Sequence, residues 1–180
     1  PDYEFRTLDA IARAQRQTPV EMYRRIVKDG GATIVCRSMQ EEDIRAFYAQ
    51  PWVMVSSDGG IGIPHPRAAG AYPRVLGRYV REQRWLKLEE AIRKMTSLPA
   101  ARLGLKDRGT IRRGMKADLV LFDAERIIDR STFKEPGLIA SGVSRVFING
   151  VGVWSDGAVT GNKPGRVLRH GPGRNRRARR

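Results

Sequence analysis

Apolar residues recur at helical spacing through the first fifty residues. The spacing predicts a helix over residues 7–15 and a second helix that starts at residue 18 and ends at the glycine pair 30–31. The second helix opens with an N-cap, a proline at the first helical position and a capping box: Thr18, Pro19 and Glu21. A third helix is predicted after Ser38, which would form a capping box with Glu41. Its inward face would hold three apolar residues: Ile44, Phe47 and Tyr48.

Two short apolar runs lie on either side of the third helix. Residues 32–36 and 52–55 are rich in β-branched and large apolar side chains, so both runs predict buried strands. A strand, a helix and a strand within about 25 residues form a βαβ unit, whose strands are parallel and joined by a right-handed crossover. The first half of the chain therefore has the pattern of an α/β protein.

The second half of the chain changes from helices to strands. Its apolar spacing predicts helices over residues 72–82, 87–97 and 98–103. Short β-branched runs then predict strands over residues 117–122, 143–149 and 152–154. The dipeptide Asn149-Gly150 favours a tight hairpin between the last two strands. We therefore expect a small β-domain after the helices.

A polar loop follows the run 52–55 and carries most of the candidate chemistry. Asp58 comes directly after the predicted strand, and α/β barrels place catalytic groups at the carboxyl ends of their strands. Seven residues further on, two prolines flank His65, and Arg67 follows. Either motif alone has an ordinary interpretation, because Asp-Gly is a common turn and a proline-rich loop is a common surface feature.

Composition changes this picture little. The chain has 180 residues, which is enough for a core, and 41% of them are apolar. The net charge is +15, but residues 165–180 contain seven arginines and no acid. Residues 170–180 are therefore predicted to form a disordered basic tail, which we expect to bind nucleic acid and other polyanions only non-specifically.

Cysteine content and hydropathy exclude some classes of protein. The single cysteine, Cys36, rules out an intrachain disulfide and fits a buried thiol better than a metal ligand. No apolar run reaches the roughly 18 residues of a membrane span, so no membrane contact is expected. The chain starts with Pro1 rather than Met, so we expect the natural start to lie upstream. We expect a cytoplasmic location, with export left open.

The polar loop and the residues after it resemble the N-acyl-D-amino-acid deacylases, the D-aminoacylase-like members of the metal-dependent amidohydrolase superfamily. The stretches similar to the deacylases are SSDGG, PHPR, YPRVLGRYVRE and TGNKPGRVLR, and residues 95–123 resemble the exit from the barrel in much of the amidohydrolase superfamily. The resemblance extends over residues 7–169. It implies an α/β fold: the last two strands and helices of a TIM (β/α)8 barrel over residues 1–104, a small β-domain over residues 105–169, and the basic tail of residues 170–180.

The resemblance also implies an activity and roles for five residues. In this family a zinc ion activates the water that attacks the acyl carbonyl of an N-acyl-D-amino acid, and the products are a carboxylate and a D-amino acid. Asp58 matches the aspartate that acts as general base and acid beside the metal, and it is a candidate zinc ligand. Arg67 matches the arginine that holds the α-carboxylate of the substrate. His65, Ser57 and Gly59 would line the substrate pocket or support the loop.

The sequence contains too few ligands for the zinc site of this family. Its two histidines are His65 and His170, whereas a zinc site needs three or four ligands. We therefore expect the C-terminal part of a larger enzyme, inactive alone, whose N-terminal barrel portion is missing here. Two alternatives stay open. One is another amidohydrolase, related to dihydroorotases or hydantoinases, and the other is a non-enzymatic module that binds polyanions.

Overall fold

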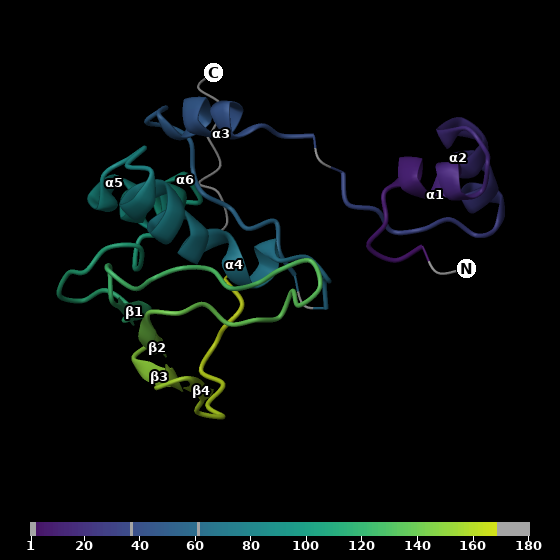
Figure 1. Cartoon of the computed structure of the whole chain (residues 1–180). Helices are drawn as coiled ribbons and strands as arrows, with labels where there is room; N and C mark the ends of the chain where they lie inside the picture. The colour runs from purple at the N-terminus through teal and green to yellow at the C-terminus, as the bar shows by residue number, and fades with distance from the viewer. Residues whose placement is uncertain (1–2, 37, 61, 169–180) are drawn as a thin grey trace, which may run out of the picture. The chain divides into compact units, whose positions relative to one another are not determined.

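The computed structural model describes residues 3–36, 38–60 and 62–168. The chain divides into two compact units, Pro1–Gln40 and Glu41–Arg180 (Figure 1). Each unit has its own core and is described by itself. The predicted basic tail, residues 170–180, lies outside the described residues.

The first unit is a pair of helices, α1 (Leu8–Ala14) and α2 (Pro19–Lys28). The predicted capping box of α2 is formed, because Glu21 N–H donates to Thr18 Oγ1 at 3.2 Å and Thr18 N–H donates to Glu21 Oε2 at 2.8 Å. The backbone N–H and the hydroxyl of Thr18 both donate to the Glu21 carboxylate, and these two hydrogen bonds hold the pKa of Glu21 below its ordinary value. The two helices bury three residues between them: Ile11, Ala12 and Met22. Both helix predictions for this unit are confirmed.

The second unit places its helices before its sheet. Its described helical segments are α3 (Glu41–Tyr48), α4 (Arg67–Arg74), the π-helical turns of η1 (Val75–Glu82), α5 (Leu88–Met95) and α6 (Ser97–Arg102). The η1 turns continue directly from α4, so the helix predicted over residues 72–82 in fact begins at Arg67, the last residue of the polar loop. None of the helices that the structure describes is long and apolar enough to cross a bilayer.

Helix α3 differs from its prediction at its start and on its apolar face. It begins at Glu41, so Glu41 is its first residue and not the third residue after a Ser38 cap. Ile44 and Tyr48 pack against the core, but Phe47 is 59% exposed. Phe47 lies about 60° to one side of Ile44 and about 100° from Tyr48 around the helix, so it stands at the edge of the packed face, on the side away from Tyr48.

Neither predicted barrel strand is a strand in this structure. Residues 32–36 and 52–55 have irregular conformations, and the strands among the described residues all belong to one antiparallel sheet later in the chain. The predicted βαβ unit and its parallel pairing are therefore wrong for the described structure. A strand needs a neighbouring strand to satisfy its backbone N–H and C=O groups, and the described residues offer none to these two runs.

The run 52–55 is held instead by the carboxyl end of α5. Val55 is buried, and its N–H donates to the carbonyl oxygen of Lys94 at 3.1 Å. The side chain of Lys94 is 1% exposed, and its ammonium donates to the carbonyl oxygens of Gln50 and Val53. Its Nζ also lies 3.6 Å from Glu90 Oε1. This buried lysine therefore fixes the stretch of chain that leads into the polar loop.

We expect Lys94→Met to lower the free energy of unfolding by about 2–4 kcal/mol. Methionine fills a similar volume but leaves the carbonyl oxygens of Gln50 and Val53 without their donor. Urea unfolding followed by circular dichroism measures the loss. The control is Lys106→Met, because Lys106 is exposed. Equal unfolding free energies for both variants would show that Lys94 does not hold this segment.

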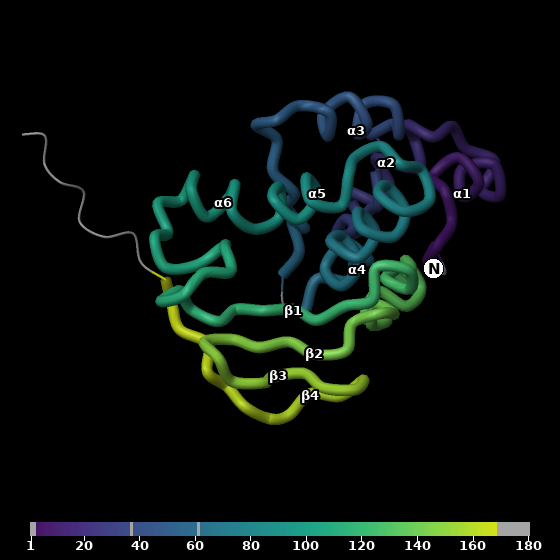
Figure 2. The backbone as a smooth tube through the Cα atoms, turned by 90° about the vertical axis from the view of Figure 1, so that its left-hand side faces the viewer, coloured from purple at the N-terminus to yellow at the C-terminus, as the bar shows by residue number. Residues whose placement is uncertain are grey.

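The sheet has four antiparallel strands in the order β1-β2-β3-β4, which run side by side in Figure 2. The strands are β1 (Leu119–Phe122), β2 (Val143–Ile148), β3 (Val151–Ser155) and β4 (Ala158–Val159). Asn149 and Gly150 have φ angles of 50° and 81°, which confirms the predicted hairpin turn. Asp156 and Gly157, at 49° and 92°, make a second turn of this kind and add β4, which the sequence analysis missed.

Two arginines join the α4–η1 helix to the segment between β1 and β2. Arg74 forms an ion pair with Asp129, with Nη1 and Oδ2 at 2.9 Å, and the Asp129 side chain is only 12% exposed. Arg81 Nη1 donates to the carbonyl oxygens of Ile127 at 2.6 Å and Ala124 at 3.1 Å. The segment that connects the first two strands therefore lies against the helix that begins at the polar loop.

Candidate active-site loop

Residues 58–67, which we call the site loop, begin with Asp58 in a left-handed backbone conformation. Its φ is 46°, a region that aspartate tolerates better than most residues. A Cβ atom on Gly59 would lie 2.7 Å from Ala68 Cα, so this close approach of the loop to α4 requires glycine. The N–H of Gly59 donates to Ser57 Oγ at 3.2 Å. Ser57 and Gly59 therefore shape the turn that presents Asp58, whose side chain is 85% exposed.

Arg67 closes the site loop and returns its side chain to Asp58. It is the first residue of α4, and its side chain is 39% exposed. Arg67 Nη2 lies 3.0 Å from Asp58 Oδ2, and Arg67 Nε donates to the backbone carbonyl oxygen of Asp58 at 2.8 Å. The structure therefore brings together the two residues to which the sequence analysis gave the main chemical roles.

His65 supports Arg67 from within the loop. The backbone N–H of Arg67 donates to His65 Nδ1 at 3.1 Å, so this nitrogen acts as an acceptor and the imidazole is neutral. The His65 ring also meets Phe133 edge-on, with ring centroids 5.2 Å apart and an interplanar angle of 82°. Burial and the nearby Arg67 guanidinium lower the pKa of His65, and the Asp58 carboxylate opposes them only in part.

This pKa shift predicts a pH dependence of stability. The pKa of His65 is lower in the folded chain than in the unfolded chain. Between these two pKa values the folded state binds fewer protons than the unfolded state, so the free energy of unfolding should rise with pH in that range. Stability should therefore decrease as the pH falls toward and below the ordinary histidine pKa of about 6.5. We expect His65→Asn to flatten this dependence, because asparagine keeps an acceptor and does not titrate.

Urea unfolding at several pH values measures this effect, with His170→Asn as the control for the second histidine of the sequence. A His65→Asn profile as steep as that of the unsubstituted chain would show that another group causes the pH dependence.

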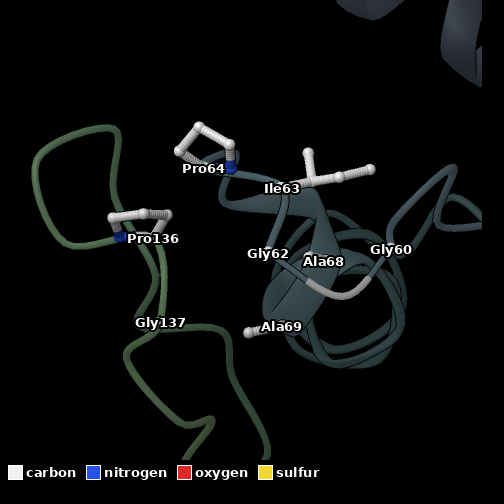
Figure 3. A pocket seen from close by; sticks show the side chains of 8 residues that line it. All are labelled: Gly60, Gly62, Ile63, Pro64, Ala68, Ala69, Pro136 and Gly137. Carbon is white, nitrogen blue, oxygen red and sulfur yellow. The ribbon is translucent and has the colours of Figure 1, made fainter.

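A shallow apolar hollow of about 490 Å³ lies beside the site loop (Figure 3). One wall is the loop and the start of α4, and the other is the segment between β1 and β2. The hollow is lined by Gly60, Gly62, Ile63, Pro64, Ala68, Ala69, Pro136 and Gly137. In Figure 3 the stretch with Pro136 and Gly137 faces the helix that carries Ala68 and Ala69. The described residues that line the hollow therefore include no charged side chain.

The described residues do not form a zinc site by themselves. Among residues 3–36, 38–60 and 62–168, no group of three or more His, Cys, Asp or Glu side chains could hold a metal ion. Asp58 is exposed and can offer one carboxylate ligand, whereas His65 Nδ1 accepts the N–H of Arg67. Cys36 is exposed, so the prediction of a buried thiol is wrong, because the strand expected to bury it is not formed.

Two further residues contact the site loop and were not predicted from the sequence: Ser131 and Phe133. Both lie between β1 and β2, more than sixty residues after the loop. Ser131 Oγ donates to the carbonyl oxygen of Pro66 at 2.8 Å, and Phe133 packs on His65. Neither lies in a motif or in an apolar repeat, so the sequence has no local signal for them.

Comparison with known proteins identifies the family. The sequence profile described as amidohydrolase family matches residues 3–160. The chain belongs to the amidohydrolase family. Solved D-aminoacylase structures superpose on this chain, so the chain has the fold of the matching part of those enzymes. Within the described residues that part consists of helices and one small antiparallel sheet.

The most informative similar amidohydrolases are deacylases. The chain is 40% identical to the N-acyl-D-glutamate deacylase of Alcaligenes xylosoxydans xylosoxydans, over 89% of this chain and 31% of that protein. It is 46% identical to the N-acyl-D-aspartate deacylase of the same organism, over 74% of this chain and 27% of that protein. The chain therefore spans about a third of the length of these relatives.

One of the similar solved structures contains a metal ion and an inhibitor. The N-acyl-D-glutamate deacylase of Bordetella bronchiseptica was solved with zinc and a phosphonate inhibitor that mimics the tetrahedral intermediate of the reaction. It superposes on the chain with a TM-score of 0.75 and 36% identity, over 85% of this chain and 32% of that one.

Proposed function

We propose that the site loop belongs to the active site of a zinc-dependent N-acyl-D-amino-acid deacylase, which hydrolyses a linear amide bond. The observation that carries the proposal is the 3.0 Å ion pair of Asp58 and Arg67. It lies in a chain that is 40% and 46% identical to two such deacylases. One loop then presents a carboxylate that can move a proton and a guanidinium that can hold the carboxylate of an amino acid.

Asp58 moves the proton in this proposal. Its carboxylate takes a proton from water as the water oxygen bonds to the acyl carbon, and it returns that proton to the amide nitrogen as the C–N bond breaks. The products are a carboxylate and a D-amino acid. The side chain of Asp58 is 85% exposed, and within the described part of the chain it forms an ion pair with Arg67.

Arg67 binds the α-carboxylate of the substrate. A guanidinium has a planar set of donors that matches a carboxylate, and Arg67 already uses Nε and Nη2 toward the two oxygen atoms of Asp58 named above. A substrate carboxylate that replaces the Asp58 carboxylate at Nη2 would release Asp58 for proton transfer. His65, Ser57 and Gly59 keep the loop in the shape that this exchange requires.

Zinc, when bound, would lower the pKa of the attacking water. Asp58 can supply one ligand, and we propose that the other ligands come from barrel strands outside the described residues. The relatives support this proposal, because the chain spans about a third of their length. Residues 1–104 would complete such a barrel, residues 105–169 would form its small β-domain, and the N-terminal barrel portion would be the partner of this chain.

The exposed apolar residues also support a barrel partner. Ile34 is 76% exposed and Trp52 is 66% exposed, and both lie in runs that the sequence predicts as buried strands. Large exposed apolar side chains in such runs are typical of a surface that another element covers. We propose that residues 32–36 and 52–55 become strands when neighbouring barrel strands are present.

The test is a hybrid enzyme in which this chain replaces the matched third of the N-acyl-D-glutamate deacylase from Alcaligenes. We expect the hybrid enzyme with zinc to release D-amino acids from N-acetyl-D-amino acids, and the 180-residue chain alone with zinc to release none. Turnover by the isolated chain that Asp58→Asn abolishes would contradict the need for further ligands. A folded, zinc-loaded hybrid enzyme with no hydrolytic activity would contradict the proposed function.

A further inference from the structure

We propose that residues 129–137, which we call the clamp segment, position Arg67 for substrate binding through Phe133 and Ser131. The clamp segment belongs to the connection between β1 and β2, outside the site loop and far from it in sequence. The inference rests on the proposed role of Arg67 and adds two positioning residues to it. It assigns a function to contacts that link the small sheet region to the site loop.

Phe133 acts through His65. The edge of one ring meets the face of the other with centroids 5.2 Å apart, a geometry that favours one orientation of the imidazole. That orientation directs His65 Nδ1 at the backbone N–H of Arg67, which donates to it at 3.1 Å. The ring of Phe133 therefore fixes the imidazole, and the imidazole fixes the backbone of the residue that binds the substrate.

Ser131 acts through Pro66, the residue before Arg67. Ser131 is 9% exposed, and its hydroxyl donates to the carbonyl oxygen of Pro66 at 2.8 Å. The same carbonyl accepts the N–H of Gly70 at 2.8 Å in the first turn of α4. A Cβ atom on Gly70 would lie 2.4 Å from Ser131 Oγ, so the clamp segment lies directly against the helix. Ser131 therefore fixes the start of α4.

The clamp segment is itself held at several points. Asp129 at its start forms the 2.9 Å ion pair with Arg74 in α4. Its turn is closed by hydrogen bonds from Glu135 N–H to Thr132 Oγ1 at 3.0 Å and from Thr132 N–H to the Glu135 carbonyl oxygen at 3.1 Å. Pro136 then lines the hollow beside the site loop (Figure 3). Because the clamp segment is held at these points, its contacts with His65 and Pro66 can keep Arg67 in one position.

The expected effect is on substrate binding. Loss of the Phe133 ring should leave the Arg67 guanidinium present but less well placed, so Phe133→Leu should raise KM for an N-acyl-D-amino acid about 2- to 10-fold. The change in kcat should be smaller, since Asp58 keeps its own contacts. The effect on KM should vanish for a substrate whose α-carboxylate is a carboxamide, because Arg67 then has no partner to bind.

The first readout is made on the 180-residue chain itself. Diethyl pyrocarbonate modifies neutral imidazoles, and mass spectrometry gives the rate at His65 with His170 as the internal reference. Phe133→Leu and Ser131→Ala should each raise the relative rate at His65, and Phe133→Tyr should restore the rate of the unsubstituted chain. The matched control is Phe47→Leu, because Phe47 is also exposed, at 59% against 42% for Phe133.

The second readout is the kinetics of the same variants in the hybrid enzyme. An unchanged modification rate at His65 in Phe133→Leu would overturn the inference whatever the hybrid enzyme does. A raised rate without a rise in KM for the acid substrate would also overturn it. If Arg67→Ala itself leaves KM and kcat/KM unchanged, the proposed function of Arg67 fails, and the clamp segment then has no role in substrate binding.

Discussion

Asp58→Asn should lower kcat of the hybrid enzyme by about 10²- to 10⁴-fold, which is the range for the loss of a general acid–base group. Asparagine has the shape of aspartate and tolerates the left-handed backbone at φ 46°, so the site loop should keep its conformation. The amide cannot accept the proton of the attacking water and return it to the leaving nitrogen. Steady-state kinetics with an N-acetyl-D-amino acid and saturating zinc measure the loss.

The matched control is Asp156→Asn. Asp156 is also followed by glycine and has a φ of 49°, but it lies in the turn between β3 and β4. We expect this variant to keep the kcat of the unsubstituted hybrid enzyme. A loss of kcat for Asp58→Asn no larger than that for Asp156→Asn would contradict the role of Asp58 in proton transfer.

Arg67→Ala should lower kcat/KM by roughly 30- to 1,000-fold, or about 2–4 kcal/mol, for a substrate with a free α-carboxylate. The substitution removes the planar pair of donors that would hold the carboxylate and orient the scissile amide. Arg67→Lys keeps the positive charge but loses the planar pair of donors. Its kcat/KM should therefore lie between that of the unsubstituted hybrid enzyme and that of Arg67→Ala. The loss should shrink sharply for the corresponding carboxamide substrate.

The control for Arg67 is Arg78→Ala. Arg78 also forms a surface ion pair, at 3.1 Å from Glu41, and its side chain is 38% exposed against 39% for Arg67. We expect Arg78→Ala to change kcat/KM little for either substrate. Equal losses on the acid and the carboxamide for Arg67→Ala would show that Arg67 does not bind the α-carboxylate.

Local sequence signals predicted the elements whose contacts are local. The capping box of Thr18 and Glu21 marks the start of α2, and the turn at Asn149-Gly150 marks the hairpin of β2 and β3. The boundary between the site loop and the helix that follows it was predicted less accurately. The apolar spacing places a helix only from residue 72, but α4 begins at Arg67, because Pro66 can start a helix without any apolar repeat.

Contacts between distant residues account for the errors. The apolar runs 32–36 and 52–55 have strand composition, but a strand forms only with a neighbour, and composition does not show whether a neighbour exists. Lys94 has the spacing of an exposed ion-pair partner for Glu90, yet it is buried against carbonyl oxygens more than forty residues earlier. No periodic pattern indicates such a contact.

In the candidate site, too, the residues close together in sequence were predicted and the contacts between distant residues were not. Asp58, His65 and Arg67 were found from their order along the chain and from the resemblance to deacylases, and the structure brings them together in one loop. The contacts of Ser131 and Phe133 depend on how the connection between β1 and β2 folds back onto α4, which residues so far apart in sequence do not reveal.

The most direct test of the account compares the two enantiomers of an N-acetyl amino acid as substrates of the zinc-loaded hybrid enzyme. The account predicts release of the D-amino acid, little or no release of the L-amino acid, and loss of both the activity and the enantiomer preference when a chelator removes zinc. Equal rates for the two enantiomers, or release that continues unchanged without zinc, would contradict the assignment of this chain to the active site of an N-acyl-D-amino-acid deacylase.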